Sequence, residues 1–566
     1  MDIKQSILSC FDKKIAKKFE LNEKNIVVPP NANLGDFCVA LFSHAKTMHL
    51  SPTQVASLML EGFDYSKIVE KTQVVGGYLN FFVSKKMFLK SVVDEILACP
   101  NTFGSSNEGS GKTVCIDFSS INMAKYMHIG HLSSTVIGNV IRNLHNFFGY
   151  KTIAINYVGD YGTPFGKMVR AHQLWGNEND LKNGGIGYAQ DLYIRFCKEA
   201  SLDNGELDEQ ARETFKKIEQ KDGAVYPIYL KFMRDAKIEA EKIYNMMGIS
   251  FDSWRGESYY CNKMQPVIDE LKNNGLLLES NGAQVVNLEN YNLGVALVVK
   301  SDGSTIYLTR DLAACEDRFE TYNFCKSIYV TDVSQKLHFA QLFKIMQLLK
   351  KQYADDLEHV YYGRISLPDG KISSRLGKQA LLKDIIEFSM NKAKKFAEQN
   401  SDLSAEEKQK VVKAVGVGAV VFCAVKNEKI KDSVFDITEA LDINGETSPY
   451  IQYTCARCHS IENKADAFDS NFEFDFDSVC NQSAMELAKA LLNFKESVRQ
   501  ALEKREPCLV SRNLIDISKA FNKYYSNNRV IDNGKTCQTR LALVLCTKNV
   551  LQIGLKLLGI EVLSKM

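Results

Sequence analysis

The sequence lacks a long uninterrupted apolar run, which excludes an ordinary membrane-spanning helix. The longest apolar stretch, residues 414–425, contains two glycines and is too short for a hydrocarbon core of about 30 Å. The first eleven residues show no basic stretch followed by an apolar core, so we expect no secretory signal. We therefore expect a cytoplasmic protein that does not contact a membrane.

A strong net charge is also missing. The chain has 70 basic and 68 acidic side chains, which leaves a formal charge of +2. A nearly neutral protein attracts a polyanion only through local patches. The charge therefore neither indicates nor excludes binding of a nucleic acid.

A regular cysteine framework is absent as well. The 15 cysteines are scattered and odd in number, which favours reduced, mostly buried thiols over disulfides. Cys455, Cys458 and His459 have the spacing that attaches c-type haem, but the flanking sequence offers no second ligand pair for zinc. We expect these thiols to lie on a helix within residues 450–465, and we expect no metal, zinc or haem site.

The chain, with 566 residues, is long enough for several domains. Residues 1–108 mix helical stretches with a strand-like segment and end in a linker rich in serine and glycine at 105–112. We predict an α+β domain over residues 1–108, an α/β domain over 109–440 and an all-α domain over 441–566.

The start of the second domain has the pattern of a βαβ unit. Residues 114–118 are a short apolar run, residues 132–148 carry an apolar stripe at helical spacing, and residues 152–157 form a second apolar run. This predicts a parallel, doubly wound, Rossmann-like sheet. In such sheets ligands bind beyond the carboxyl ends of the strands.

Residues 164–247 are helical and charged, which indicates an insertion into this domain. We predict that the sheet resumes with strands at 296–300 and 305–308, a helix from Asp311, and strands at 327–330 and 358–362. Two halves of one doubly wound sheet fit this order best.

The loop between the first strand and its helix contains His128, Gly130 and His131. A helix amino terminus favours phosphates, because its N–H groups are unpaired and it carries partial positive charge. A glycine lets a flat base approach the backbone, and imidazoles can donate to phosphate oxygens. This pattern predicts a nucleotide site.

The stretch 128–131 resembles the H-I-G-H signature of class I aminoacyl-tRNA synthetases, and the longer stretch from Asp117 to 159–166 resembles the arginyl-tRNA synthetase family. The resemblance implies that ATP binds His128, Gly130 and His131, with both histidines catalytic. The family has a proline where Ile121 stands. Ser120 and Asn122 match, and they are implied to hold the amino and carboxylate groups of the amino acid, with His131 beside them.

The second signature of the class is matched by residues 369–375, in which Lys371 and Ser373 are implied to bind ATP and Lys371 to be catalytic. The class usually has a further lysine where Ser374 stands. Members of the family often lack it, and a lysine ahead of the first signature is thought to compensate. Lys125 occupies that place.

A guanidinium is best held by a carboxylate and neutral acceptors. The family resemblance assigns arginine binding to Glu257, Tyr307, Asp311 and Gln335. From the residues alone, Asp311 is better explained as a helix cap and Tyr307 as a core residue.

The stretch 449–457 resembles the start of the family's anticodon-binding domain, and it implies tRNA contacts for Tyr450, Gln452, Tyr453 and Arg457. Aromatic rings beside amides and an arginine suit splayed bases, although ordinary helix packing also explains each tyrosine alone. The first domain resembles the family's extension that contacts the tRNA elbow.

The resemblance as a whole implies an arginine–tRNA ligase that uses ATP with Mg²⁺ as its counter-ion, with arginine and tRNA(Arg) as partners and a monomeric state. Two alternatives remain. A small-molecule nucleotidyltransferase would share the H-x-G-H chemistry without needing the helical domain. A non-catalytic tRNA-binding relative would keep that domain but lose the site residues, which are intact here.

Overall fold

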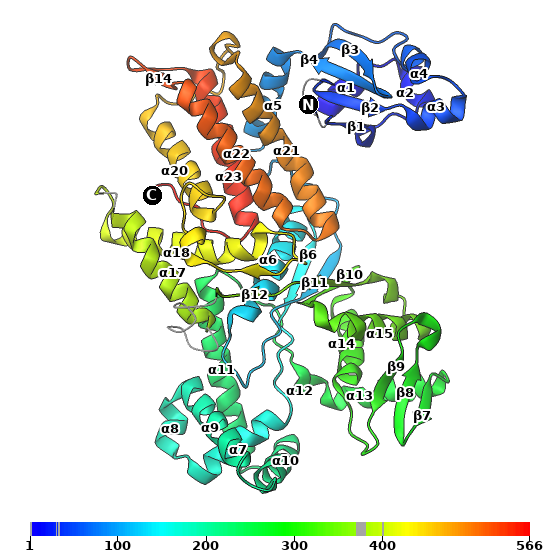
Figure 1. The fold of residues 1–566 in the computed structure, drawn as a ribbon, viewed down its shortest axis with the longest axis vertical. Helices are drawn as coiled ribbons and strands as arrows, with labels where there is room; N and C mark the ends of the chain where they lie inside the picture. The colour runs from blue at the N-terminus through cyan, green and yellow to red at the C-terminus, as the bar shows by residue number, and fades with distance from the viewer. Residues whose placement is uncertain (1–2, 30, 32–33, 369–380, 399–400) are drawn as a thin grey trace.

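The computed structural model describes residues 3–29, 31, 34–368, 381–398 and 401–566 (Figure 1). The parallel sheet lies at the centre, with helices of the carboxyl-terminal part on one side and two further subdomains on the other. The amino-terminal sheet projects from the far end of the helical part. In the described part of the chain, no helix is both long and apolar enough to span a bilayer.

The amino-terminal part is an antiparallel sheet of order β1-β2-β4-β3 with short helices packed on it. Its strands are β1 (Ile26–Val27), β2 (Phe37–Ala40), β3 (Val69–Val75) and β4 (Tyr78–Val83). Its helices are α1 (Ile3–Leu8), α2 (Lys13–Lys18), α3 (Phe42–Met48) and α4 (Pro52–Met59). Positive φ angles at Gly76 and Gly77 suit the tight turn between β3 and β4, which the sequence predicts.

The next helix, α5 (Lys85–Ala98), leaves this sheet and packs on α21 (Gln482–Lys504) and α23 (Gln538–Leu557). Its buried side chains recur at helical spacing: Phe88, Leu89, Val92, Val93 and Ile96. The predicted first domain, residues 1–108, therefore includes both the antiparallel sheet and a helix that packs on the carboxyl-terminal helices. Its boundary at residue 108 stays a prediction.

The predicted parallel sheet is confirmed, in the order β11-β10-β5-β6 with every pair parallel. Its strands are β5 (Thr113–Asp117), β6 (Lys151–Ile155), β10 (Lys326–Asp332) and β11 (Leu357–Tyr362). The crossover helix from β5 to β6 is α6 (Leu132–Phe147), and it ends before Gly149, whose φ is +83°. A β-carbon at Gly138 would collide with Phe118, so this glycine allows α6 to lie close to the end of β5.

The predicted helical insertion is also confirmed, and Figure 1 shows it as a separate group below the sheet. Its helices are α7 (Thr163–Trp175), α8 (Glu178–Asn183), α9 (Gly185–Ala200), α10 (Glu206–Glu219) and α11 (Tyr226–Met246). The long helix α11 returns the chain to the sheet. Near its end, the Tyr244 hydroxyl is hydrogen-bonded to the hydroxyl of Ser119, which follows β5.

The segment between the insertion and β10 differs from the prediction. The expected strand at 296–300 exists as β9 (Val295–Val299), but it pairs antiparallel with β8 (Ala283–Asn287), which pairs with β7 (Leu277–Ser280), in a sheet of its own. The expected strand at 305–308 is wrong, since α14 (Tyr307–Tyr322) already begins there. Short apolar runs fit a strand or a buried helix turn equally well. The connecting helices are α12 (Glu257–Tyr260), α13 (Met264–Asn273) and α15 (Lys336–Leu348).

Helices dominate after residue 381, as predicted. They are α17 (Leu382–Glu398), α18 (Ala405–Lys426), α19 (Ile437–Ala440), α20 (Ser448–Lys464), α21, α22 (Cys508–Asn527) and α23. Two short strands, β12 (Ile365–Ser366) and β13 (Ser433–Val434), pair in parallel before α19. Ser404 and Glu407 form a capping box at the start of α18. Cys455 and Cys458 lie on α20 with no exposed surface.

Candidate active site

A cavity of about 440 Å³ lies where the carboxyl ends of β5 and β10 meet the first turns of α14. We call it the central cavity. Parallel sheets bind ligands at this edge. Six residues that the sequence singles out line it: Ser120, Asn122, Glu257, Tyr307, Asp311 and Gln335. Residues that are far apart in the chain thus meet at one site.

A buried ion pair forms the floor of the central cavity. The Arg318 guanidinium lies 2.6 Å from the Asp117 carboxylate, and these side chains are only 3% and 6% exposed. Burial raises the pKa of Asp117, while Arg318 and a hydrogen bond from Ser120 oppose that rise. The guanidinium also lies 5.3 Å from the Tyr157 ring and 5.2 Å from the Tyr329 ring, so cation–π contacts add to the pair.

The backbone after β5 is held in an unusual conformation. Ser119 and Ser120 have φ angles of +69° and +47°, which cost about 1–3 kcal/mol each for residues other than glycine. The Ser119 hydroxyl is 2.7 Å from those of Thr135 and Tyr244. The Ser120 hydroxyl donates to Asp117 Oδ1 at 2.8 Å. These bonds impose the geometry that turns Ser120 toward the cavity.

Asp311 and Tyr307 lie one helical turn apart on α14, with His338 from α15 opposite them. His338 Nε2 is 2.7 Å from Asp311 Oδ2, and its ring centroid is 4.8 Å from that of Tyr307. Tyr307 is 56% exposed, so it is not a core residue. Asp311 is not a helix cap either, because the N-cap of α14 is Ile306. Gln335 precedes α15 and completes this wall.

Glu257 faces the cavity from α12 and is already paired with an arginine of the chain. Its Oε2 lies 3.1 Å from the Arg310 guanidinium. Burial raises the pKa of Glu257 to about 7; Arg310 opposes the rise, and Asp311 and Asp160 add to it. Close to neutral pH, Glu257 is therefore a carboxyl group that a second cation can switch to its ionised form.

The predicted nucleotide loop runs from Asn122, at the cavity, to the start of α6. The rings of His128 and His131 lie 4.1 Å apart. His128 Nδ1 accepts the Gly130 N–H and His131 Nδ1 accepts the His128 N–H, both at 3.1 Å. Burial lowers the pKa of His128, helped by Lys125, and it lowers that of His131 to about 4, helped by His128.

Two neutral rings whose Nδ1 atoms accept hydrogen bonds must carry their protons on Nε2. Both histidines therefore present an Nε2–H donor. Gly130 between them is exposed, and so is Lys125. The loop can thus offer donors and one cation to an anion at the amino terminus of α6.

The same loop is tied to the segment that begins α17. His128 and Leu381 form an antiparallel bridge, and the Leu382 N–H donates to the Met127 carbonyl at 2.9 Å. The residues expected in the second signature, Lys371 and Ser373, lie outside the described residues. The described chain on the carboxyl side of that signature, at Leu381, adjoins the histidines.

A second, larger hollow of about 890 Å³ adjoins the central cavity, between α10, α11, α12 and the turn after β9. We call it the side groove. Aromatic rings and cations share its lining: Tyr161, Phe215, Tyr226, Tyr259, Arg212, Lys216, Lys221, Lys300 and Arg310. Rings beside cations suit single-stranded nucleotides, which stack on the former and place phosphates near the latter.

The four residues expected to contact tRNA bases lie on α20, but they are not equally accessible. Gln452 is fully buried, and its amide donates to the Ala414 and Glu561 carbonyls. The expected contact between Gln452 and a base therefore does not fit this structure. Tyr453 is exposed, whereas Tyr450 and Arg457 are half-buried and both contact Asn522.

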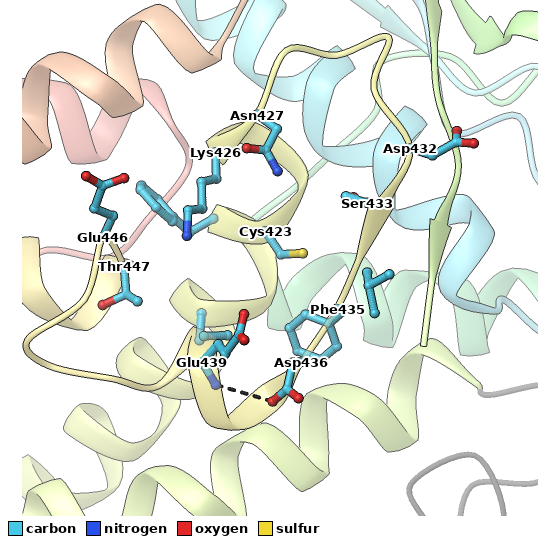
Figure 2. Close-up of a pocket in the computed structure, with 14 residues that line it drawn as sticks. Cys423, Lys426, Asn427, Asp432, Ser433, Phe435, Asp436, Glu439, Glu446 and Thr447 are labelled. Atoms are coloured by element: carbon cyan, nitrogen blue, oxygen red, sulfur yellow. Dashed lines mark hydrogen bonds between the residues drawn. The ribbon is translucent and has the colours of Figure 1, made fainter. Parts of the chain in front are cut away.

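Another cavity, of about 290 Å³, lies between α18, α19 and β13 (Figure 2). Lys426 shares it with four carboxylates: Asp432, Asp436, Glu439 and Glu446. It contains none of the residues that the sequence singles out, and a group of acidic side chains does not by itself define a site. Over the described residues, no cluster of three or more His, Cys, Asp or Glu side chains is arranged to hold a metal ion.

Sequence reasoning missed Arg318, His338 and Tyr157 as cavity residues. Arg318 could have been found, because it lies seven residues after Asp311 and so shares its helix face. Nothing local marks Tyr157, whose place depends on the pairing of β6 with β5.

Comparison with known proteins agrees with this arrangement. Three family descriptions match successive parts of the chain: the arginyl tRNA synthetase N terminal domain over residues 1–83, the tRNA synthetases class I (R) catalytic domain over 92–437, and the DALR anticodon binding domain over 451–566. Similar curated relatives include the arginine–tRNA ligases of Halothermothrix orenii and Clostridium perfringens. Each is 40% identical, with 100% of both chains covered.

Solved structures show the same fold. The arginyl-tRNA synthetase of Thermus thermophilus superposes with a TM-score of 0.80 at 22% identity, and that of Plasmodium falciparum with 0.78 at 24% identity. Each comparison covers 100% of this chain and 99% of the other. The order of the three domains, the central cavity and the full-length match together show that the chain belongs to the arginyl-tRNA synthetase family.

Proposed function

We propose that the protein is an arginine–tRNA ligase, which activates arginine with ATP and transfers it to the 3′ end of tRNA(Arg). One observation carries the proposal: Asp311 and Glu257 share a cavity with Ser120 and Asn122, at the start of the loop that leads to His128 and His131. A site for a cationic side chain therefore opens directly toward a site for phosphate.

In the first step, the arginine carboxylate attacks the α-phosphate of ATP, giving arginyl-adenylate and pyrophosphate. The Nε2–H groups of His128 and His131 donate to phosphate oxygens as negative charge builds up, and Lys125 and Lys371 add positive charge. No protein nucleophile is required, so the protein accelerates the reaction by positioning and charge stabilisation. Gly130 leaves room for the adenine ring, and Ser373 binds the phosphates.

In the central cavity, Asp311 and Glu257 bind the guanidinium of the substrate, with Tyr307 and Gln335 beside it. Ser120 and Asn122 hold the amino and carboxylate groups, next to His131. The charge-assisted bonds of a guanidinium to two carboxylates favour arginine over neutral amino acids of similar length.

Mg²⁺ is the counter-ion of the nucleotide. His128 and His131 use Nδ1 to accept backbone N–H groups, and Mg²⁺ prefers oxygen ligands, so phosphate oxygens and water suit the ion better than these imidazoles do. The ion would neutralise phosphate charge while the chain's own residues orient ATP.

In the second step, the terminal ribose hydroxyl of tRNA takes the aminoacyl group. The side groove supports a path for the 3′ end, because it combines rings and cations and adjoins the central cavity. Tyr450, Tyr453 and Arg457 on α20 are proposed to meet the anticodon loop, Tyr453 most directly. We assign residues 1–108 to contacts with the tRNA elbow, 109–440 to catalysis and 441–566 to the anticodon.

We place the enzyme in the cytoplasm as a monomer. Six of the residues assigned to arginine line one cavity within a single chain, which is compatible with a monomer. A small-molecule nucleotidyltransferase remains the alternative, and it would turn over without tRNA.

The deciding experiment is ATP–pyrophosphate exchange with each of the twenty amino acids, with and without tRNA. We expect robust exchange with arginine alone, and its loss in Asp311→Ala while the protein stays folded. Asp269→Ala is a matched control, because Asp269 is exposed on helix α13 and lines neither hollow. Robust exchange with another amino acid, or full activity of Asp311→Ala, would refute the proposal.

A further inference from the structure

Arg310 occupies the wall between the two hollows described above. Its neighbour in sequence, Asp311, lines the central cavity, whereas Arg310 itself lines the side groove. The guanidinium reaches Glu257, which lines the central cavity, at 3.1 Å. It also lies 5.1 Å from the ring of Tyr161 in the side groove. Only 11% of the Arg310 side chain is exposed. Its guanidinium is thus held by one contact in each hollow, with Glu257 and with Tyr161.

The groups around Glu257 make Arg310 necessary for its charge. Burial and two carboxylates, Asp311 and Asp160, disfavour an ionised Glu257, and Arg310 is the cation that opposes them. Asp160 is itself bonded to the Ser258 hydroxyl and amide. His338 is already hydrogen-bonded to Asp311. A carboxyl group crowded in this way takes up a proton when its cation is removed.

We infer that Arg310 is a positioning residue for amino-acid selection, which favours the ionised form of Glu257 and aims it into the cavity so that a substrate guanidinium meets two carboxylates. Arg310 does not touch the arginine substrate in this arrangement. It acts through Glu257, and its own guanidinium is kept from the substrate's place by the contact with Tyr161. The inference rests on the proposed function, because it assigns the central cavity to arginine.

The chemistry of the pair predicts a distinctive pH dependence. Arginine binding requires ionised Glu257, so KM for arginine should fall as pH rises through the pKa of Glu257, which is about 7. In Arg310→Met this pKa moves up. KM should then fall about tenfold per pH unit up to a higher pH than in the unaltered protein.

The test measures KM for arginine and kcat in tRNA charging from pH 6 to pH 9, at saturating ATP and tRNA. We expect Arg310→Met to raise KM at pH 7 about tenfold or more, with recovery toward pH 9 and a smaller change in kcat. Arg310→Lys should restore most of the profile. Glu257→Gln should remove the pH dependence, and the double variant E257Q/R310M should match E257Q.

Arg255→Met is the matched control. Arg255 also pairs with a carboxylate, that of Asp317, at 2.9 Å. In the variant Asp317 would keep Lys263 as a partner, and neither Arg255 nor Asp317 lines the central cavity. We expect its pH profile to be unchanged. Calorimetric titration of arginine in buffers of different ionisation enthalpy gives a readout without turnover: R310M should release more protons on binding at pH 7 than the unaltered protein does.

The outcomes distinguish a failure of the proposed function from a failure of the role of Arg310. If the unaltered protein charges no tRNA with arginine, the proposed function fails. If it charges tRNA and R310M lowers kcat with an unshifted KM profile, or R310M and E257Q are additive in the double variant, the role of Arg310 is refuted while the function stands.

Discussion

Loss of the buried cation Arg318 should destabilise the catalytic domain strongly. The pair of Arg318 with Asp117 is nearly inaccessible to water, with 3% and 6% side-chain exposure. Arg318→Met keeps most of the side-chain volume but leaves Asp117 without a counter-ion. Breaking such a pair from one side costs about 3–5 kcal/mol. We expect a loss of this size in the free energy of unfolding at pH 8.

The loss should depend on pH in a definite direction. Burial raises the pKa of Asp117 even with Arg318 present, and removal of Arg318 raises it further. A carboxyl group whose folded pKa exceeds its unfolded value stabilises the fold below the unfolded pKa and loses that effect as pH rises through the folded pKa. Arg318→Met should therefore lie closer to the unaltered protein at pH 5 than at pH 8.

Urea unfolding followed by tryptophan fluorescence measures this change, because Trp254 packs on Tyr244, whose hydroxyl bonds Ser119 beside the pair. The double variant D117N/R318M should recover most of the stability, since it buries no unpaired charge. Lys90→Met, which removes the exposed pair with Asp94, should change nothing measurable. A loss in Arg318→Met no greater than in Lys90→Met would show that this reasoning is wrong.

Two further predictions concern pH and tRNA. Burial lowers the pKa of His145 to about 4, with Arg505 adding to the effect, so the fold loses stability as pH falls from about 6.5 to about 4. The melting temperature of His145→Gln should therefore fall less over this pH range than that of the exposed control His49→Gln. Equal falls in melting temperature would contradict this prediction. Lys216→Ala, in the side groove, should raise KM for tRNA and reduce the slope of log KM against log salt by about one, whereas Lys198→Ala on α9, outside the groove, should not; equal effects would remove the groove from the tRNA path.

Much of the catalytic core was predictable, because its signals are local. The apolar stripe over residues 132–148 predicts α6, and the apolar runs on either side of it predict β5 and β6. The predicted cavity residues Ser120, Asn122 and Asp311 do meet, although only the family resemblance linked them in the sequence.

The errors have physical reasons. Tyr307 was expected at the end of a strand, but a run of four residues cannot distinguish a strand from the first turn of α14. The family resemblance implies a tRNA contact for Gln452, but its amide is buried against the Ala414 and Glu561 carbonyls, which are far away in sequence. The pairing of Arg310 with Glu257 likewise arises only from the fold.

The bridge between His128 and Leu381 joins the backbone of the histidine loop to the start of helix α17. This helix packs along α18, which in turn contacts α20 and α22 in the domain that we assign to the anticodon. A nucleic acid bound at α20 would therefore contact a series of packed helices whose last member, α17, begins beside the backbone of His128. The domain assigned to the anticodon and the loop assigned to phosphate are thereby joined through direct contacts of three helices, α20, α18 and α17.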